Sequence, residues 1–317
     1  KTGNEIIKPA ETAHVTDFSY NVYQYNNTGI GRSVVIVGGI EKYSDYNSRD
    51  GISAGLTLCN ITIDAGQYSD SMSVDCRNQL AGELKNASGV ASDKVLRVVY
   101  LLGNAETTYI DLQEGSKLTG GTAWWKGPGI TAWSASVYIN GGIVCDNLCS
   151  SDFDEGAISV VDGGKFELSD GEVYGNYNCH GIYVSKNVEL TITGGKVFKN
   201  SKMGIRSQDV RDEGTPEIRI EGCSVYENEG GGIAIGSGTI KNAEIYKNKT
   251  EKNGAGLYIG SGVTLIDNCK IYENTVATTD ENNNFGGAGI YYAGKENTVL
   301  TIRNTEIKSN SINNNNG

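Results

Sequence analysis

Short segments that alternate aliphatic and polar residues recur along the chain between glycine-rich turns. One such segment is an aliphatic residue, two variable residues and an asparagine. This asparagine phrase occurs seven times, as VCDN (144–147), VYGN (173–176), VFKN (197–200), VYEN (225–228), IYKN (245–248), IYEN (271–274) and IKSN (307–310). Successive asparagines are separated by 29, 24, 28, 20, 26 and 36 residues, so the basic period lies in the low twenties and is lengthened by insertions.

Two further segments alternate with the asparagine phrase. The first joins small residues to an aliphatic-x-aliphatic run, as in GAISV (156–160), HGIYV (180–184), GGIAI (231–235), AGLYI (255–259) and AGIYY (288–292), with MGIRS (203–207) a weaker copy. The second is an alternating stretch just before most asparagine phrases, such as VELTI, PEIRI or TVLTI. Three short alternating segments per period predict an all-β parallel solenoid with one coil per repeat and three short strands per coil.

The repeats predict columns of equivalent residues along the solenoid, because each strand stacks on its equivalent about 4.8 Å away. We expect the asparagines to form a ladder at a turn, where their amides bond the backbone and each other and where Asn tolerates unusual backbone angles. An aromatic column is expected to stack beside it: Tyr174, Phe198, Tyr226, Tyr246 and Tyr272. A column of small residues should face inward: Gly171, Gly195, Cys223, Ala243, Cys269 and Thr305. Cys223 and Cys269 would then be buried two coils apart, roughly 9–10 Å, which is too far for a disulfide.

The pattern IYEN…GGAGIYY resembles the parallel β-helix repeats of the pectate-lyase-like superfamily. It is also similar to the Gly-Gly-Ala-Ile repeats, with their aromatic-x-x-Asn partner, of bacterial surface and autotransported adhesins. The resemblance is good over residues 135–317 and poor over 51–134, and it implies a right-handed single-stranded parallel β-helix. Residues 1–50 lack the repeat and are expected to be an N-terminal capping segment. The β-helix would then occupy 51–317, with a tryptophan-containing insert at 121–134.

Composition narrows the class of protein. The 317 residues include 43 Gly, 18 Tyr and only 3 Pro, which suits many short strands joined by tight turns. The net charge of −11 argues against nucleic acid as a partner, since phosphate binding needs clustered Lys and Arg. Apolar runs are of strand length, so we expect no membrane span in this chain. The sequence begins without Met and ends in NSINNNNG without a capping pattern, and we expect it to be part of a longer surface protein.

The seven cysteines are an odd number, so at least one is unpaired within the chain. Cys145 and Cys149 form a CxxxC without the second pair that a zinc site needs, and a surface or core role is expected for both. The pairing among Cys59, Cys76, Cys145, Cys149 and Cys179 stays open.

Candidate ligand-binding residues lie at the outward positions of the small-residue strand: Ser159, Tyr183, Arg206, Ala234, Tyr258 and Tyr291. Tyr rings stack on the apolar faces of sugars and Arg reaches carboxylates or hydroxyls, so Tyr183, Arg206, Tyr258 and Tyr291 would suit a polysaccharide-binding surface. The alternative is that aromatic residues stand there because they favour strands.

All three tryptophans of the chain, Trp124, Trp125 and Trp133, fall in the glycine-rich stretch GTAWWKGPGITAWS. Their clustering is typical of an exposed aromatic patch that binds glycans, and a loop folded over the flank of the β-helix explains it equally well.

A catalytic site is the competing hypothesis. Asp154 and Glu155 precede one strand, His180 stands at the equivalent place one coil later, and Arg206 belongs to the following coil. The HGI step is similar to the His-Gly step of polygalacturonase-like hydrolases, which implies an inverting acid pair. The Asn-Thr-Asp and Arg-Ile-Lys motifs of those enzymes are missing, so the alternative of a turn histidine stays open.

No cofactor is expected, with calcium the one alternative. A lyase would use acidic residues to hold Ca²⁺ near a uronate, and the stretch QDVRDEGTPE offers Asp209, Asp212 and Glu213. The stretch matches no known calcium loop, so solvated acidic residues explain it as well.

Three functions follow for a fold that hosts many activities. The first is a secreted or cell-surface bacterial module, adhesin-like, that binds a polysaccharide or host glycan. The second is a polysaccharide lyase or glycoside hydrolase of the pectate-lyase-like class. The third is a passive structural stalk. The incomplete catalytic motifs favour binding.

Overall fold

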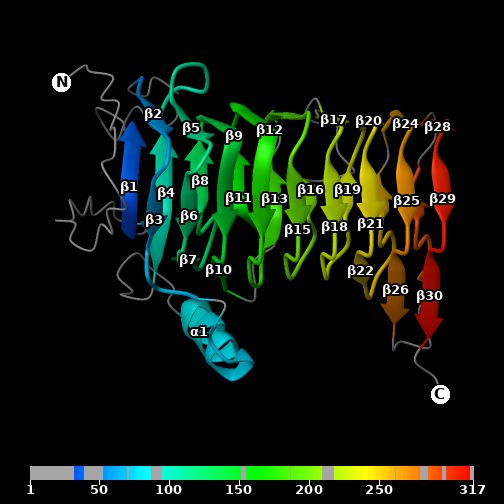
Figure 1. The fold of residues 1–317 in the computed structure, drawn as a ribbon, viewed down its shortest axis with the longest axis horizontal. Coiled ribbons are helices and arrows are strands. Elements are labelled where there is room, and N and C mark those ends of the chain that lie inside the picture. The colour runs from blue at the N-terminus through cyan, green and yellow to red at the C-terminus, as the bar shows by residue number, and fades with distance from the viewer. Residues whose placement is uncertain are drawn as a thin grey trace.

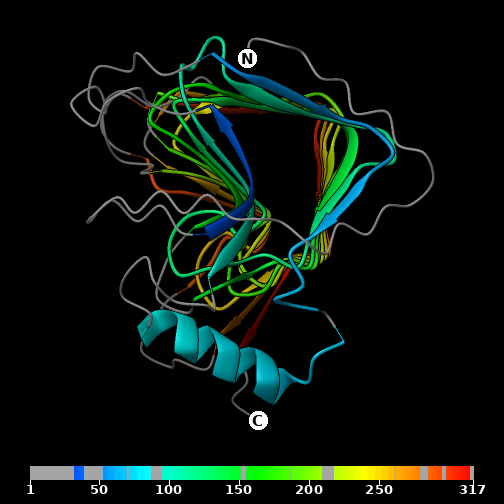
Figure 2. The ribbon, with the colours of Figure 1, turned by 90° about the vertical axis from the view of Figure 1, so that its left-hand side faces the viewer.

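The chain folds into a stack of parallel coils. The computed structural model describes residues 32–38, 53–69, 71–86, 95–150, 155–185, 187–208, 218–260, 262–278, 285–294 and 298–314. Within these residues there are 30 strands and one helix, α1 (Val74–Asn86). Figure 1 shows the strands following one another along a single axis, and Figure 2 shows the three-sided outline of the tube.

Three sheets run along the described part of the solenoid. Sheet A contains β1 (Arg32–Gly38), β4 (Leu96–Leu102), β7 (Thr122–Ala123), β8 (Ile130–Trp133), β10 (Leu148–Cys149), β11 (Gly156–Val161), β13 (His180–Val184), β16 (Ile205–Ser207), β19 (Ile233–Ile235), β23 (Leu257–Ile259) and β27 (Ile290–Tyr292). Sheet C contains β22 (Lys249–Thr250), β26 (Thr275–Thr278) and β30 (Ser311–Asn314). All pairings are parallel except the contact of β4 with β7, which is the topology expected when each coil stacks on the one before it.

Sheet B supplies the other two sides of the tube. It contains β2 (Gly55–Leu58), β3 (Thr62–Asp64), β5 (Tyr109–Gln113), β6 (Lys117–Thr119), β9 (Ser136–Cys145), β12 (Lys165–Tyr174), β14 (Glu189–Ile192), β15 (Lys196–Phe198), β17 (Ile218–Glu221), β18 (Ser224–Tyr226), β20 (Gly238–Lys241), β21 (Glu244–Tyr246), β24 (Thr264–Asp267), β25 (Lys270–Tyr272), β28 (Leu300–Arg303) and β29 (Glu306–Lys308). The long strand β12 pairs with β14 through its first half and with β15 through its second half. Each regular coil therefore contributes three short strands, as the repeat predicts.

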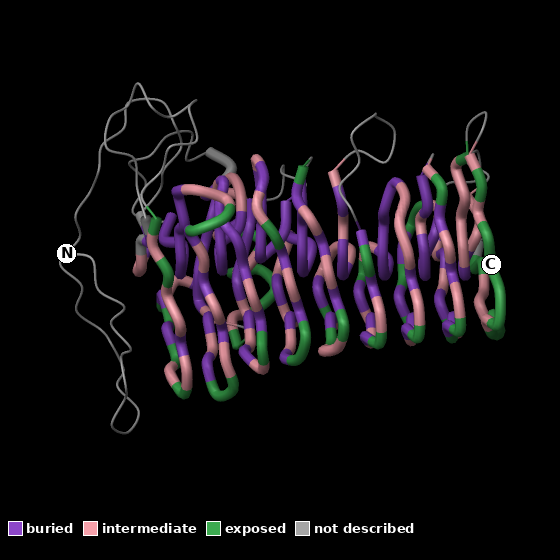
Figure 3. Tube along the Cα trace, turned by 90° about the horizontal axis from the view of Figure 1, so that it is seen from above, coloured by how far each residue is buried: buried purple, intermediate pink, exposed green. Residues whose placement is uncertain are grey.

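Columns of aliphatic residues fill the interior of the tube. In sheet A, one such column is made of fully buried residues in register from coil to coil: Ile158, Ile182, Ile205, Ile233 and Leu257. Burial alternates along each coil, and exposed residues gather at the bends (Figure 3). Cys223 and Cys269, each 2% exposed, join this core as free thiols, which confirms their predicted inward position.

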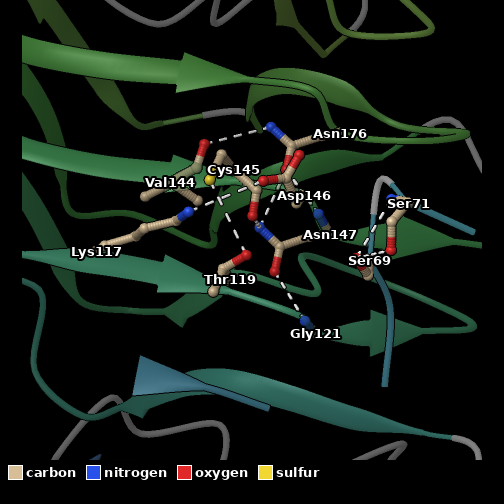
Figure 4. Close-up of polar contacts among 10 residues, drawn as sticks. All are labelled: Ser69, Ser71, Lys117, Thr119, Gly121, Val144, Cys145, Asp146, Asn147 and Asn176. Atoms are coloured by element: carbon tan, nitrogen blue, oxygen red, sulfur yellow. Dashed lines mark hydrogen bonds and ion pairs between the residues drawn. The ribbon is translucent and has the colours of Figure 1, made fainter. Parts of the chain in front are cut away.

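The expected asparagine ladder is present and buried. Six side-chain amides each donate to the Oδ1 of the next ladder asparagine at 2.8–3.0 Å, and Asn310 accepts the last of these bonds. The ladder is Asn147, Asn176, Asn200, Asn228, Asn248, Asn274 and Asn310. Figure 4 shows its first members, where Asn147 also accepts a hydrogen bond from the backbone of Gly121. The ladder thus joins successive coils at one corner of the tube.

The backbone at this turn differs from the prediction that Asn itself takes the unusual angles. The residue before each ladder asparagine has φ between 53° and 65°: Asp146, Gly175, Lys199, Glu227, Lys247, Glu273 and Ser309. The ladder asparagine instead places its amide inside the turn, where it bonds to buried carbonyl groups. At another turn, three asparagines outside the ladder do take left-handed angles: Asn242, Asn268 and Asn304 have φ of 51°, 53° and 50°.

The predicted aromatic column also stacks. Tyr174, Phe198, Tyr226, Tyr246 and Tyr272 have ring centroids 4.8–5.0 Å apart and interplanar angles of 2–18°. This spacing is close to the distance between neighbouring strands, so each ring stacks on the equivalent ring of the next coil.

Three features of the first coils differ from the simple pattern. The helix α1 was not predicted, and it lies outside the tube in both Figure 1 and Figure 2. It packs through Ala81 and Leu84 on a small cluster that includes Leu148. Within the expected capping segment, β1 pairs in parallel with β4 and so extends sheet A. Within the expected insert, β8 lies between β4 and β11 and is a regular part of the same sheet.

Candidate functional site

The outer surface of sheet A carries a row of residues in register, which we call the outer row. It is formed by Ser159, Tyr183, Arg206, Ala234, Tyr258 and Tyr291. Their chain neighbours on the strands, such as Leu257 and Ile259 on either side of Tyr258, are buried in the core. Because side chains alternate along a strand, the outer row points away from the core, as predicted.

The outer row divides into a covered half and an open half. Ser159 is fully buried and Tyr183 is 8% exposed, although both point outward. Arg206, Tyr258 and Tyr291 are partly exposed. The expectation of a continuous exposed surface is therefore wrong at the first two positions, which another segment of the chain covers, and at Ala234, which is 4% exposed.

The open half presents two aromatic rings and a guanidinium group. The rings of Tyr258 and Tyr291 stack with centroids 5.3 Å apart and planes inclined by 29°. Ala234 separates Tyr258 from Arg206 and projects little beyond the backbone. From Arg206 to Tyr291 the row crosses three strand spacings, about 14 Å. The arrangement is a shallow strip with an aromatic end and a cationic end.

The segment that covers the other half carries Trp125 and Lys126. The Nζ of Lys126 forms an ion pair with Oε1 of Glu155 at 2.9 Å, and both side chains are about nine-tenths buried. The same Nζ lies 4.7 Å from the ring centroid of Trp125 and 5.8 Å from that of Tyr183. A buried ammonium held by one carboxylate and two aromatic faces fixes this segment on sheet A.

The three tryptophans lie together, with centroids 6.1 Å apart for Trp124 and Trp125 and 6.0 Å for Trp125 and Trp133. Each is only partly exposed. Trp124 packs beside the cluster under α1, and Trp133 donates from Nε1 to Oδ2 of Asp162 at 3.3 Å. The sequence left two explanations open, an exposed aromatic patch and a loop folded over the flank of the tube. The packing of Trp124 favours the second.

Arg97 is a buried charge that the sequence pattern did not single out. Its side chain is fully buried and donates from Nη2 to the carbonyl oxygen of Trp125 at 2.6 Å. Its guanidinium carbon lies 5.9 Å from the ring centroid of Tyr100, and burial lowers the pKa of Arg97. The signal was available in VLRVVYLLG, where a single Arg interrupts an otherwise apolar strand.

The proposed catalytic residues are only partly brought together. The backbone N–H of His180 donates to the carbonyl oxygen of Glu155 at 2.9 Å, so the two residues lie on adjacent coils. The Nδ1 of His180 accepts from the backbone N–H of Met203 at 3.0 Å, and the ring is 2% exposed. Arg206 pairs in register with Tyr183, one coil beyond His180. The Glu155 carboxylate therefore pairs with Lys126, and the Nδ1 atom of His180 is bonded to the backbone.

The remaining acidic candidates lie outside the described residues: Asp154, Asp209, Asp212 and Glu213. Among the residues that the structure does describe, no group of three or more His, Cys, Asp and Glu side chains is placed to hold a metal ion. Within the same residues, no helix is long and apolar enough to cross a membrane.

Comparison with known proteins gives one family. A family model described as the right handed beta helix region matches residues 122–276 and 180–317, which together cover more than half of the chain. No curated protein and no solved structure gives a significant match.

Proposed function

The chain belongs to the right-handed β-helix family, as its repeats predict, and from this premise we propose that it is a glycan-binding module of a secreted or cell-surface protein. The ligand is a polysaccharide or host glycan lying along the open half of the outer row. The observation that carries the proposal is the in-register strip of Arg206, Tyr258 and Tyr291 on one flat sheet.

The chemistry of the strip suits a sugar chain. A tyrosine ring offers an apolar face to the C–H face of a sugar and a hydroxyl at its rim. A guanidinium offers several donors to hydroxyl or carboxylate oxygens. Ala234 between them is only 4% exposed, so a ligand would contact the strip through Arg206 at one end and the two tyrosines at the other. The strip is shallow and regular, which suits an extended polymer better than a small molecule, whose sites are usually concave.

The charge environment favours binding over hydrolysis at the neighbouring coils. Glu155, the candidate acid that the structure describes, is buried and engaged by Lys126 at 2.9 Å. An inverting hydrolase needs one carboxyl group to protonate the leaving oxygen and another to activate a water molecule about 6.5–9.5 Å away. The ion pair with Lys126 instead gives the Glu155 carboxylate a structural role on sheet A.

The proposal is tested by screening the protein on a glycan array and by incubating the same polysaccharides with it, with and without calcium. Tyr258→Ala should weaken binding about 3- to 10-fold, the loss expected for one aromatic contact. Tyr272→Ala is the matched control, because Tyr272 is a partly exposed tyrosine in the aromatic column of sheet B. The control should change affinity less than about 2-fold.

Two results would overturn the proposal. Release of new reducing ends or unsaturated uronates would assign the chain to the enzymes, and Glu155 and His180 would become the first residues to substitute. Equal losses from Tyr258→Ala and Tyr272→Ala would move the binding site off the outer row.

A further inference from the structure

Two buried cysteines lie side by side on adjacent coils. Cys149 ends β10 and is 1% exposed, and Cys179 immediately precedes β13 and is fully buried. Both are free thiols in this structure, and together with Ala157 they form a small cluster separate from the core of the tube.

The backbone places the two residues on adjacent coils, one position out of register with each other. Leu148 and Tyr177 form a parallel bridge, and the N–H of Cys149 donates to the carbonyl oxygen of Tyr177 at 3.0 Å. Neighbouring strands lie about 4.8 Å apart and one residue advances about 3.3 Å along a strand, so a diagonal pair has Cα atoms about 6 Å apart. The Cα atoms of a disulfide lie about 4.4–6.8 Å apart. The spacing of these two residues therefore suits a disulfide, unlike that of Cys223 and Cys269, which lie two coils apart.

The two side chains pack together in the cluster with Ala157. Burial, followed by the neighbouring Cys179 thiol, raises the pKa of Cys149. Their other neighbours are carbonyl oxygens: Cys179 Sγ lies 3.3 Å from that of Tyr177, and Cys149 Sγ lies 3.8 Å from that of Lys126. Carbonyl groups do not compete for a bond between the sulfur atoms.

We propose that Cys149 and Cys179 form a structural disulfide when the chain folds in an oxidising compartment. The oxidant is a small-molecule disulfide such as oxidised glutathione. One cysteine thiolate attacks it and expels a first thiolate, and the second cysteine then attacks the mixed disulfide and expels a second. The two protons lost by the cysteines are taken up by the two leaving thiolates, so one disulfide is exchanged for another.

The bond would fasten the coil that carries Cys149 to the next one beside the covered half of the outer row. Because Cys149 contacts the backbone of Lys126, the disulfide would also support the segment that carries Trp125. Burial of both sulfur atoms keeps the oxidant away from them in the folded protein, so the bond should form readily during folding and slowly afterwards.

The first test is chemical. The unfolded, reduced protein is refolded with a mixture of reduced and oxidised glutathione, then unfolded and alkylated. We expect five of the seven cysteines to be alkylated and peptide mapping to find Cys149 linked to Cys179. Seven alkylated cysteines, or a link between other residues, would overturn the proposal. This readout does not depend on ligand binding, so its failure is separate from failure of the proposed function.

The second test is thermal. The oxidised wild type should melt about 5 °C or more above the reduced protein, because the bond closes a loop of about 30 residues. Cys179→Ala should abolish this difference. The matched control Cys223→Ala removes another buried thiol and should keep it. If Cys179→Ala retains the difference, the linked pair is not the one proposed, and if either variant fails to fold, the chemical test on the wild type still decides.

Discussion

Substitution of Asn248 by alanine tests whether the asparagine ladder stabilises the solenoid. Asn248 is fully buried and its side chain takes part in four hydrogen bonds. Its Nδ2 donates to Asn274 Oδ1 at 3.0 Å and to the carbonyl oxygen of Val225 at 2.9 Å. Its Oδ1 accepts from the backbone N–H of Asn228 at 3.1 Å and from its Nδ2 at 2.9 Å.

The loss can be worked out group by group. In the alanine variant the Nδ2 of Asn228 keeps two carbonyl partners, and Asn274 Oδ1 keeps the backbone N–H of residue 248. The buried backbone N–H of Asn228 loses its side-chain acceptor, which costs about 1–3 kcal/mol. The other three bonds contribute about 0.5–1.5 kcal/mol each. We therefore expect Asn248→Ala to lower the free energy of unfolding by about 2.5–7.5 kcal/mol.

The measurement is guanidinium unfolding followed by circular dichroism, with hydrogen exchange to locate the loss. Because repeats interact mainly with their neighbours, protection should fall around β18, β21 and β25 more than in distant coils. Asn140→Ala is the matched control, since this exposed asparagine makes two side-chain hydrogen bonds, to Asp111 and Ser169, and should cost less than about 1 kcal/mol. Equal costs for the two variants would refute the reasoning.

Three further predictions follow from burial and packing. Gly256→Ala should destabilise the solenoid by about 1–3 kcal/mol, because the added Cβ would lie 2.5 Å from a backbone carbonyl oxygen of the next coil. Gly82→Ala in α1 meets open space and should stabilise the protein by about 0.5–1 kcal/mol. The midpoints of guanidinium unfolding check both changes. Burial raises the pKa of Cys223 from 9.0 to about 12, so the unfolded state loses this proton first and stability should fall as the pH rises from 9 to 12. Unfolding midpoints should fall less steeply across this range in Cys223→Ala, while Cys145 and Tyr246, whose pKa values are also raised by burial, keep part of the slope. Lys126→Met should cost about 3–5 kcal/mol by removing the ammonium from the buried Glu155 carboxylate, and the added change Glu155→Gln should restore part of the loss in the same assay.

The strands, the ladder and the aromatic column could be predicted because each depends on a short repeated phrase. The alternation of aliphatic residues fixes which side chains enter the core, and repetition places equivalents on neighbouring coils. A residue such as Cys223 could therefore be placed inward from parity alone. The left-handed residue before each ladder asparagine was missed, because Lys199, Glu227 and Lys247 are not residues that usually signal positive φ.

The features that cover the outside of the tube could not be predicted from the repeat. The helix α1 occurs once, and its sequence VDCRNQLAGELKN has only a weakly apolar face. The burial of Tyr183 depends on Lys126 and Trp125, which approach from a preceding coil and carry no repeated phrase. The alternation of side chains along the strand correctly predicted that Tyr183 points outward. Its burial could not be predicted, because it depends on the segment of Trp125 and Lys126 that covers it.

The contrast between two outward columns bears on where a ligand is bound. The column on sheet B that begins at Tyr174 is aromatic for five successive coils, as expected where each ring is stabilised by its neighbours. The outer row of sheet A changes at nearly every coil, from Ser159 through Tyr183, Arg206 and Ala234 to Tyr258. If the outer row served only to stack side chains between coils, the same residue type would be expected at each of its positions too. A row that differs from coil to coil on an otherwise repetitive scaffold therefore suits recognition of a ligand better than support of the fold, and this favours the open half of sheet A as the binding surface.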